Sequence, residues 1–231
     1  MSLFQQNQAG AVVLLPLLKT DSMSRHPVYS LPENRALVLD ALKEKRLTVL
    51  SIETQIAPKA GVSQGTHRAQ IRMQLRAMLT DILCSFLECA PEDIDLTHIP
   101  GQSPKKNLCL SMPEKQIYIS ISHEQGLSIA AICLDAKVGV DLVLIDAQPE
   151  WQAVADLYLG PYVSAQIASA PASQQAAYFS LQWASFEARL KCCQQALTEW
   201  SPQLEQILKN CTVHELDLPQ AYKGALALRS A

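Results

Sequence analysis

The chain has 231 residues, 48% of them hydrophobic, enough to bury one substantial core or two small joined cores. Its formal net charge of −3 and the lack of a long basic run argue against nucleic-acid binding. The seven cysteines are odd in number, show no Cys-x-x-Cys spacing and come without a secretory signal. We therefore expect reduced thiols in a cytoplasm, not a disulfide framework or a zinc site.

The first half of the chain is predicted to contain two helices and a hairpin. Residues 11–18 are apolar but too short to span a bilayer and lack a positive flank before them, so we assign them to a first strand and expect no membrane segment. Irregular stretches are expected at 19–32 and 91–112. The regular elements are helices near 33–44 and 66–87 and a hairpin at 116–134 whose turn starts at His123.

One face of the helix predicted at 66–87 carries three guanidinium groups, because Arg68, Arg72 and Arg76 stand four residues apart. A guanidinium can bind a phosphate through two parallel hydrogen bonds, and His67 stands next to the first arginine. An ordinary solvated face, balanced by acidic residues farther along the helix, would show the same stripe. Both interpretations stay open at this point.

Ser122 and His123 lie near the end of the first hairpin strand, beside the predicted turn. From a strand end both side chains could donate hydrogen bonds to a phosphate. A single histidine beside a turn is more often simply exposed to solvent.

Asp141 interrupts an aliphatic and β-branched run, 138–145, that is typical of a strand. Alternation places Gly139, Asp141 and Val143 on one face of that strand. An ionised carboxylate among such neighbours is costly unless it is paired, hydrogen-bonded or bound to a metal. The alternative is an aspartate at a strand end that reaches solvent or a backbone N–H. Gly139 indicates a bulge or a place where a ligand approaches the backbone.

A helix predicted at 173–197 places Glu187 and Lys191 one turn apart, at the border between core and water. On a solvated face such a pair would contribute only ~0.2–0.5 kcal/mol. Together with Asp141, however, the chain offers two carboxylates and an ammonium. Mg²⁺ usually takes one or two protein carboxylates and leaves its other positions to water and phosphates, so phosphate chemistry is favoured. The apolar face of this helix consists of Phe179, Trp183, Phe186, Leu190 and Leu197.

The second half of the chain is predicted to begin with a strand and to end with two. Mixed strands and helices with short hairpins indicate an α+β fold. The predicted elements are a strand at 137–145, helices near 150–158, 164–169, 173–197 and 201–209, and strands near 211–218 and 221–229.

Three ordered motifs resemble the 4′-phosphopantetheinyl transferase superfamily: Ser122-His123, Val138-Gly139-Val140-Asp141, and Trp183-x-x-x-Glu187-Ala188-x-x-Lys191. The chain length further resembles the surfactin-synthetase-activating type, in which one chain holds two similar halves. The resemblance covers roughly residues 101–200 and is weaker upstream. It implies two pseudo-twofold α+β halves, 1–135 and 136–231, each a small antiparallel sheet packed with helices, with a coenzyme A cleft between them.

The resemblance implies transfer of 4′-phosphopantetheine from coenzyme A to a serine of an acyl or peptidyl carrier protein, with Mg²⁺ as cofactor. Asp141 and Glu187 would then be metal ligands, and Glu187 would help to deprotonate the serine. Glu187 and Lys191 would be the catalytic residues, because Lys191 would face the phosphates. Coenzyme A would be bound by Arg68, with His67 as second choice, by one of Lys105 and Lys106, and by Ser122, His123 and Lys191.

The sequence also departs from the family pattern. Many members have Asp-x-Glu where this chain has Asp141-Leu142-Val143, so a third carboxylate is missing and Val143 would leave a gap in the metal's ligand shell for water or another side chain to fill. Phe186 replaces a common lysine, and Glu124 follows His123 where a small polar residue is usual. Two alternatives therefore stand beside the enzyme: a catalytically weakened homologue that binds coenzyme A or a carrier domain, and an unrelated α+β interaction domain.

The expected partners are coenzyme A and an apo carrier protein, met by a cytoplasmic monomer. Carrier domains are typically acidic, so a protein of net charge −3 would have to dock them on a local basic or apolar patch.

Overall fold

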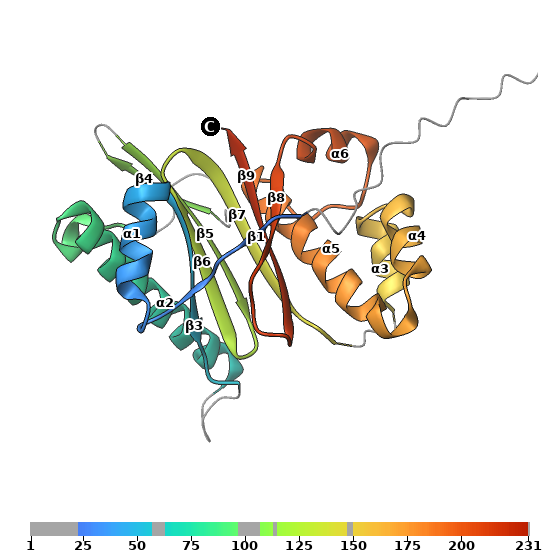
Figure 1. Cartoon of the computed structure of the whole chain (residues 1–231), viewed down its shortest axis with the longest axis horizontal. Helices are drawn as coiled ribbons and strands as arrows, with labels where there is room; N and C mark the ends of the chain where they lie inside the picture. The colour runs from blue at the N-terminus through green and yellow to red at the C-terminus, as the bar shows by residue number, and fades with distance from the viewer. Residues whose placement is uncertain (1–22, 57–62, 97–106, 113–114, 147–149, 231) are drawn as a thin grey trace, which may run out of the picture.

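The computed structural model describes residues 23–56, 63–96, 107–112, 115–146 and 150–230. Two β-sheets pack against each other in the middle of the molecule, and helices cover the outer face of each sheet (Figure 1). The predicted α+β class is therefore confirmed. Within the described ranges, no helix has the length and apolar character that crossing a membrane requires.

The first sheet has five strands, which run antiparallel except for the parallel pair β2 and β3. Two helices bury Leu42 and Leu79 against its outer face, in a core that also contains Ile119 and Ile132 of the sheet. In spatial order the strands are β2 (Tyr29–Ser30), β3 (Leu47–Glu53), β6 (Leu127–Cys133), β5 (Lys115–Glu124) and β4 (Asn107–Met112). The helices are α1 (Arg35–Lys45) and α2 (Gln64–Leu87), followed by a short 3₁₀ turn at Pro91–Asp93.

The second sheet has four strands and is covered by the long helix α5 (Ala172–Cys192). The strands, in spatial order, are β1 (Arg25–His26), β8 (Thr212–Leu216), β9 (Tyr222–Ser230) and β7 (Ala136–Leu144). Three shorter helices pack on α5 around an aromatic core that includes Phe179 and Phe186. These helices are α3 (Trp151–Tyr158), α4 (Pro161–Ser169) and α6 (Pro202–Leu208).

Strand β7 lies between the first sheet and helix α5. Its Val138, Val140 and Leu142 pack against apolar side chains of β6, while the alternate residues face α5. Gly139 allows this second contact, because a Cβ atom there would lie 2.0 Å from the carbonyl oxygen of Ala188. The bulge or ligand contact predicted at Gly139 is therefore corrected to a close approach of helix α5.

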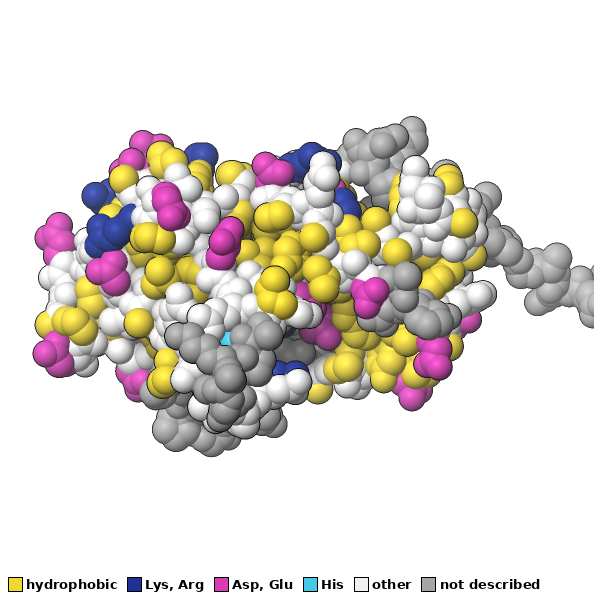
Figure 2. All heavy atoms as spheres, turned by 90° about the horizontal axis from the view of Figure 1, so that it is seen from below, with side chains coloured by type: hydrophobic (Ala, Val, Ile, Leu, Met, Phe, Trp, Pro, Cys, Tyr) yellow, Lys and Arg dark blue, Asp and Glu magenta, His cyan; other side chains and the backbone are white. Residues whose placement is uncertain are grey.

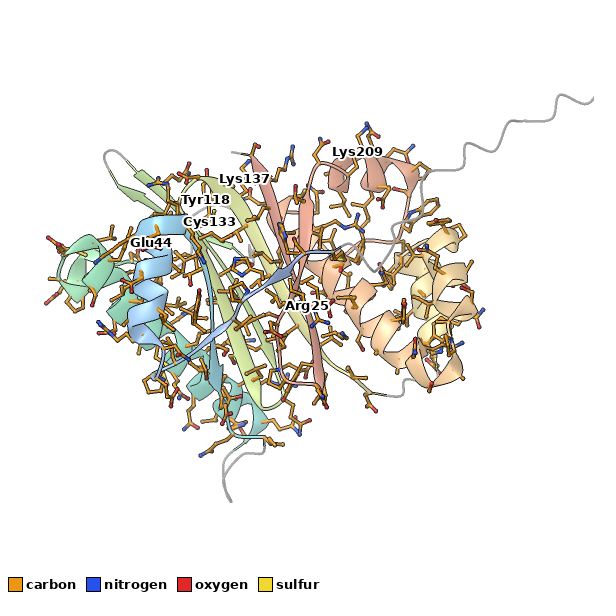
Figure 3. The ribbon with its side chains drawn as sticks, in the orientation of Figure 1. Arg25, Glu44, Tyr118, Cys133, Lys137 and Lys209 are labelled. Atoms are coloured by element: carbon orange, nitrogen blue, oxygen red, sulfur yellow. The ribbon has the colours of Figure 1, made fainter. Side chains whose placement is uncertain are left out.

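A short N-terminal segment joins the two sheets. Arg25 of β1 pairs with Glu215 in the second sheet, whereas Tyr29 of β2 pairs with Leu50 in the first. Figure 3 shows Arg25 on the strand that crosses the middle of the molecule. The division into 1–135 and 136–231 and the pseudo-twofold relation between halves stay predictions.

Most predicted elements occur within a few residues of their expected bounds, but several expectations need correction. Strand β3 was not predicted, and β4 lies inside the stretch 91–112 that was expected to be irregular. The hairpin turn lies at Gln125 and Gly126, because β5 continues through His123 to Glu124. The strand predicted at 11–18 lies outside the described residues.

Helix α5 ends five residues earlier than predicted, at Cys192, and Leu197 is 45% exposed instead of packing inward. The ending is a Schellman motif, in which Gln194 takes the left-handed conformation with φ of 57°. The Gln195 N–H donates to the Leu190 carbonyl at 2.8 Å. No residue in this stretch predicted the helix end, since glycine usually occupies the left-handed position.

Candidate functional site

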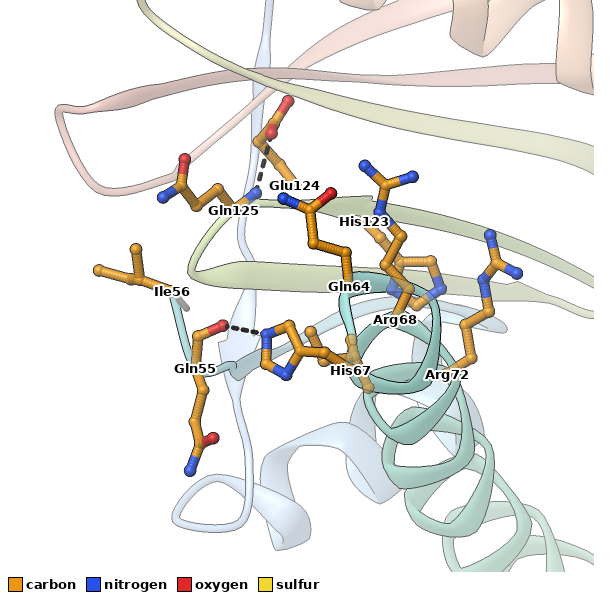
Figure 4. A pocket seen from close by; sticks show the side chains of 10 residues that line it. Gln55, Ile56, Gln64, His67, Arg68, Arg72, His123, Glu124 and Gln125 are labelled. Carbon is orange, nitrogen blue, oxygen red and sulfur yellow. Dashed lines mark hydrogen bonds between the residues drawn. The ribbon is translucent and has the colours of Figure 1, made fainter. Parts of the chain in front are cut away.

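A cavity of about 500 Å³ opens beside the first turns of α2 (Figure 4). Its walls come from α2, from the residues that follow β3, and from the tip of the β5–β6 hairpin. Three residues predicted to bind coenzyme A, His67, Arg68 and His123, line it together. The other lining residues are Gln55, Ile56, Gln64, Ile71, Arg72, Glu124 and Gln125.

Of the three arginines on one face of α2, only two line this cavity. Arg68 and Arg72 are exposed and line the cavity, whereas Arg76, one turn farther on, does not. Asp81, an acidic residue that could have balanced the stripe, accepts a hydrogen bond from Arg35 of α1 at 2.8 Å. The cavity therefore has two guanidinium groups on its helical wall, and the one acidic side chain among its lining residues, Glu124, comes from the hairpin.

His67 joins the start of α2 to the end of β3. The residue is only 9% exposed, and its Nε2 lies 3.0 Å from the carbonyl oxygen of Gln55, to which the ring donates. The helix begins at this place because the Ser63 hydroxyl accepts a hydrogen bond from the Thr66 N–H at 3.1 Å. His67 thus forms part of the cavity wall and anchors the first turn of α2, in which Arg68 is the next residue.

His123 is a neutral group in this cavity at pH 7. Its pKa is lowered to about 4, mainly by desolvation and to a smaller extent by the positive charges of Arg72, Lys191 and Arg76. Its Nδ1 lies 2.8 Å from the Ser128 hydroxyl. His123 can therefore offer a phosphate a hydrogen bond but no charge.

Asp141 is buried where β7, β5 and α5 meet, with 5% of the residue exposed. Its Oδ1 accepts hydrogen bonds from the Ser122 hydroxyl at 2.7 Å and from the Lys191 ammonium at 2.6 Å. Ser122 thus faces Asp141 and not the cavity that His123 lines. The Asp141 carboxylate, which was predicted to need a partner, therefore has two hydrogen-bond donors.

Lys191 is more buried than the helical periodicity predicts. It is 6% exposed, and besides Asp141 its Nζ contacts the carbonyl oxygens of Val140 at 2.9 Å and Ile121 at 3.2 Å. Three acceptors therefore surround an ammonium that has three N–H donors. The predicted position at the border with water is wrong for Lys191.

Burial raises the pKa of Asp141 above its ordinary value. The negative charge of Glu187 raises the pKa further, while the Lys191 ammonium and the Ser122 hydroxyl oppose both effects. Asp141 and Glu187 are thus close enough to repel each other, one on β7 and the other half-buried on α5.

The two carboxylates fit a divalent cation such as Mg²⁺. A cation between them would relieve their repulsion, and Mg²⁺ needs few protein ligands when water and phosphates complete its shell. Within the described residues, no group of three or more His, Cys, Asp or Glu side chains could hold a metal ion. The described part of the chain would therefore supply at most these two carboxylates.

The departures from the family pattern have packing explanations. Val143 is half-buried and packs against an apolar cluster that includes Ala184, Ala188 and Ala225, whereas the gap expected in the metal's ligand shell stays a prediction. Phe186 is 2% exposed, and its ring centroid lies 6.0 Å from that of Trp183. Both positions belong to apolar clusters, where a charged side chain would be costly.

Two predicted residues cannot be placed in the structure, and several residues that line the cavity were not predicted from the motifs. Lys105 and Lys106 lie outside the described residues. Glu124 lines the cavity, with its carboxylate accepting from the Gln125 N–H at 2.8 Å. The lining glutamines carried no signal in the sequence, because a glutamine near a turn or helix start is common in any protein.

Comparison with known proteins agrees with the resemblance at a coarse level. No protein-family model matches the chain. A Synechocystis sp. protein provisionally named a 4′-phosphopantetheinyl transferase is 21% identical over 119 residues, which are 52% of this chain. The match spans about half, 47%, of that protein's length. Part of the chain is thus distantly similar to a protein named after the same superfamily that the three motifs resemble.

Proposed function

We propose that this protein transfers 4′-phosphopantetheine from coenzyme A to a serine of an acyl or peptidyl carrier protein. One observation carries the proposal: neighbouring residues of β5 connect the arginine-lined cavity with the buried acidic centre formed by Asp141 and Glu187, because His123 lines the cavity and Ser122 donates to Asp141. The charges of Arg72, from the cavity, and of Lys191, from the acidic centre, both lower the pKa of His123. The pyrophosphate of coenzyme A could therefore lie between the cavity and the acidic centre.

In the proposed complex, Arg68 and Arg72 hold phosphate groups of coenzyme A by charge-assisted hydrogen bonds. His123 donates a neutral hydrogen bond, and His67 keeps the first turn of α2 in place. Lys105 or Lys106 supplies a further cation to coenzyme A. The cavity excludes part of the water that would compete for these contacts.

Asp141 and Glu187 would hold Mg²⁺, which when bound neutralises charge on the pyrophosphate oxygens. Because Oδ1 of Asp141 already accepts two hydrogen bonds, its other oxygen would bind the ion. Glu187 accepts the proton from the carrier serine hydroxyl. The serine oxygen then forms a bond to the phosphorus next to pantetheine, and the bond to 3′,5′-adenosine bisphosphate breaks.

The decisive experiment is intact mass spectrometry of carrier proteins after incubation with the enzyme, coenzyme A and Mg²⁺. We expect a phosphopantetheine adduct on at least one member of a panel of apo fatty acid, polyketide and peptide carriers. The matched controls are Asp141→Asn and Glu187→Gln, which keep the side-chain shape and should lose most of the activity. A panel left unmodified by the wild-type protein would refute the proposal.

A second candidate is a homologue that binds coenzyme A without transferring its pantetheine arm. The packing of Val143 and Phe186 favours it, because neither position could supply a further charged group to the centre. Calorimetric titration with coenzyme A, run beside the mass spectrometry, separates the two functions. Binding with no adduct on any carrier would favour this candidate.

Docking of an acidic carrier would need a local basic surface. In Figure 2, apolar and acidic side chains share the visible face and few basic ones appear, in keeping with the net charge of −3. The exposed part of α2 is different, because it carries Arg68, Arg72 and Arg76 and has no acidic residue before Asp81. We propose this helix face as the place where the carrier approaches.

A further inference from the structure

Strand β7 is an edge strand of the second sheet, so one row of its backbone groups has no neighbouring strand to pair with. Two N–H groups of this row donate to serine side chains instead. The Val140 N–H donates to the Ser120 hydroxyl at 3.0 Å, and the Leu142 N–H donates to the Ser122 hydroxyl at 3.4 Å. Two alternate serines of β5 therefore take the place of a paired strand.

Lys191 completes this junction from the other side. Its ammonium donates to the Ile121 carbonyl on β5 and to the Val140 carbonyl on β7, which belong to different sheets. The third bond of the ammonium goes to Asp141 Oδ1. One side chain from α5 thus links both sheets to the carboxylate of the acidic centre.

Ser120 and Ser122 differ in one respect. Both hydroxyls accept from a backbone N–H of β7, but only that of Ser122 also donates to Asp141. Oδ1 of Asp141 is therefore held by two donors that are themselves fixed to the backbone. A buried carboxylate held in this way has little freedom to rotate.

We propose that Ser122 and Lys191 are positioning residues for Asp141, which they hold in its ligand orientation before the metal arrives. Lys191 then acts on the reaction through Asp141 and not by touching a phosphate. The inference rests on the proposed function, because it takes Asp141 to be a metal ligand. Hydrogen-bond partners of metal ligands typically change metal affinity or activity about 10- to 100-fold when removed.

The two serines provide a matched pair for the test. Ser120→Ala and Ser122→Ala each remove one hydroxyl from β5 and leave one N–H of β7 without its acceptor, so both should lower the unfolding midpoint, Ser122→Ala the more because it also removes a donor to Asp141. Only Ser122→Ala should weaken Mn²⁺ binding, by about tenfold or more, measured by electron paramagnetic resonance of the free ion. Asp141→Asn sets the baseline for the loss of this ligand.

This binding readout does not depend on transfer activity. If Ser122→Ala weakens Mn²⁺ binding while no carrier is modified by the wild type, the positioning role stands and the proposed function falls. Equal Mn²⁺ affinity in the two serine variants, or no loss in Asp141→Asn, would overturn the positioning role.

Lys191→Met separates positioning from phosphate contact, since it keeps the apolar stem and removes the ammonium. Lower Mn²⁺ affinity and lower kcat with an unchanged KM for coenzyme A are expected. A rise in that KM with Mn²⁺ affinity retained would overturn the assignment of Lys191. Because Lys191→Met leaves Asp141 without its cation and can impair folding, Ser122→Ala remains the deciding variant.

Discussion

In the cavity beside α2, the two arginines can bind an anion through their charge, whereas His123 can offer only a neutral hydrogen bond. Arg68 and Arg72 supply guanidinium groups, which bind an anion through charge and paired hydrogen bonds. His123 is neutral down to about pH 4. Anion binding should therefore change little between pH 6 and 8 on account of this histidine.

Arg68→Ala should raise the KM for coenzyme A roughly tenfold or more, because a hydrogen bond to a charged group contributes about 1.5–3 kcal/mol. Dephospho-coenzyme A, which lacks the 3′-phosphate, should be much less affected. Steady-state kinetics with both substrates measure the difference. Arg76→Ala is the matched control, since Arg76 shares the helix face but does not line the cavity. Equal effects of Arg68→Ala on both substrates would contradict a 3′-phosphate contact.

His123 should contribute to the loss of stability in acid. Its pKa is about 4 in the folded protein and about 6.5 when unfolded, so between these values the unfolded chain binds the additional proton. Stability attributable to His123 is therefore complete above pH 6.5 and is lost as the pH falls toward 4. His123→Asn should flatten the pH dependence in this window, measured by urea unfolding at several pH values. Parallel curves for wild type and variant would show that His123 is not responsible.

The motifs predicted which residue types form the site, but not all of their partners. A buried Asp141 was expected to need a partner, and the chemistry of burial alone justified that expectation. That Lys191 would be this partner could not be foreseen, because the two residues are 50 positions apart and meet only through the packing of α5 on β7. Ser120 carried no signal, since a serine in a strand usually faces water.

At the level of elements, helix α5 approaches strand β7 closely at Gly139. Gly139 was recognised as unusual within its strand, although the approaching group is a helix backbone and not a ligand. Strand β3 was missed because its pattern shows no alternation: residues 48–52 are all buried. A sheet covered on both faces removes the period of two on which strand prediction relies.

Gly139→Ala should destabilise the protein by at least about 3 kcal/mol, the upper part of the range for overpacked cores. The added methyl would lie 2.0 Å from the Ala188 oxygen and 2.5 Å from the Cys192 nitrogen, so α5 would have to move. Gly65→Ala is the control, because its methyl would meet only Ser63 Oγ at 3.9 Å and alanine favours the helix by up to about 1 kcal/mol. Urea unfolding should show opposite signs for the two variants.

At the level of the whole molecule, the N-terminal segment holds the two sheets together. The Asp217 N–H donates to the His26 carbonyl at 3.0 Å, and the Ser24 hydroxyl lies 2.6 Å from Nδ1 of His214. These bonds fasten β1 to β8, while β2 stays in the other sheet. The sequence did not predict this arrangement, because two-residue strands are too short to give a pattern.

A chain that begins at residue 28 should self-associate, whereas one that begins at residue 23 should not. The shorter chain lacks β1 and so exposes Glu215 and Leu216 at the edge of β8, and unpaired edges recruit other strands. Size-exclusion chromatography with light scattering compares the two chains over a range of concentrations. Identical monodisperse profiles would show that β1 does not protect this edge.

The pairing of β1 with β8 also has a consequence for synthesis on the ribosome. Arg25 is among the first described residues to be made, but its partner Glu215 follows 190 positions later (215 − 25), so the second sheet cannot close until nearly all of the described chain has emerged. At about 5–20 residues per second, roughly 10–40 seconds pass between the two. During that delay the nascent chain must keep this strand segment from pairing elsewhere, which makes translation speed and chaperone access determinants of yield.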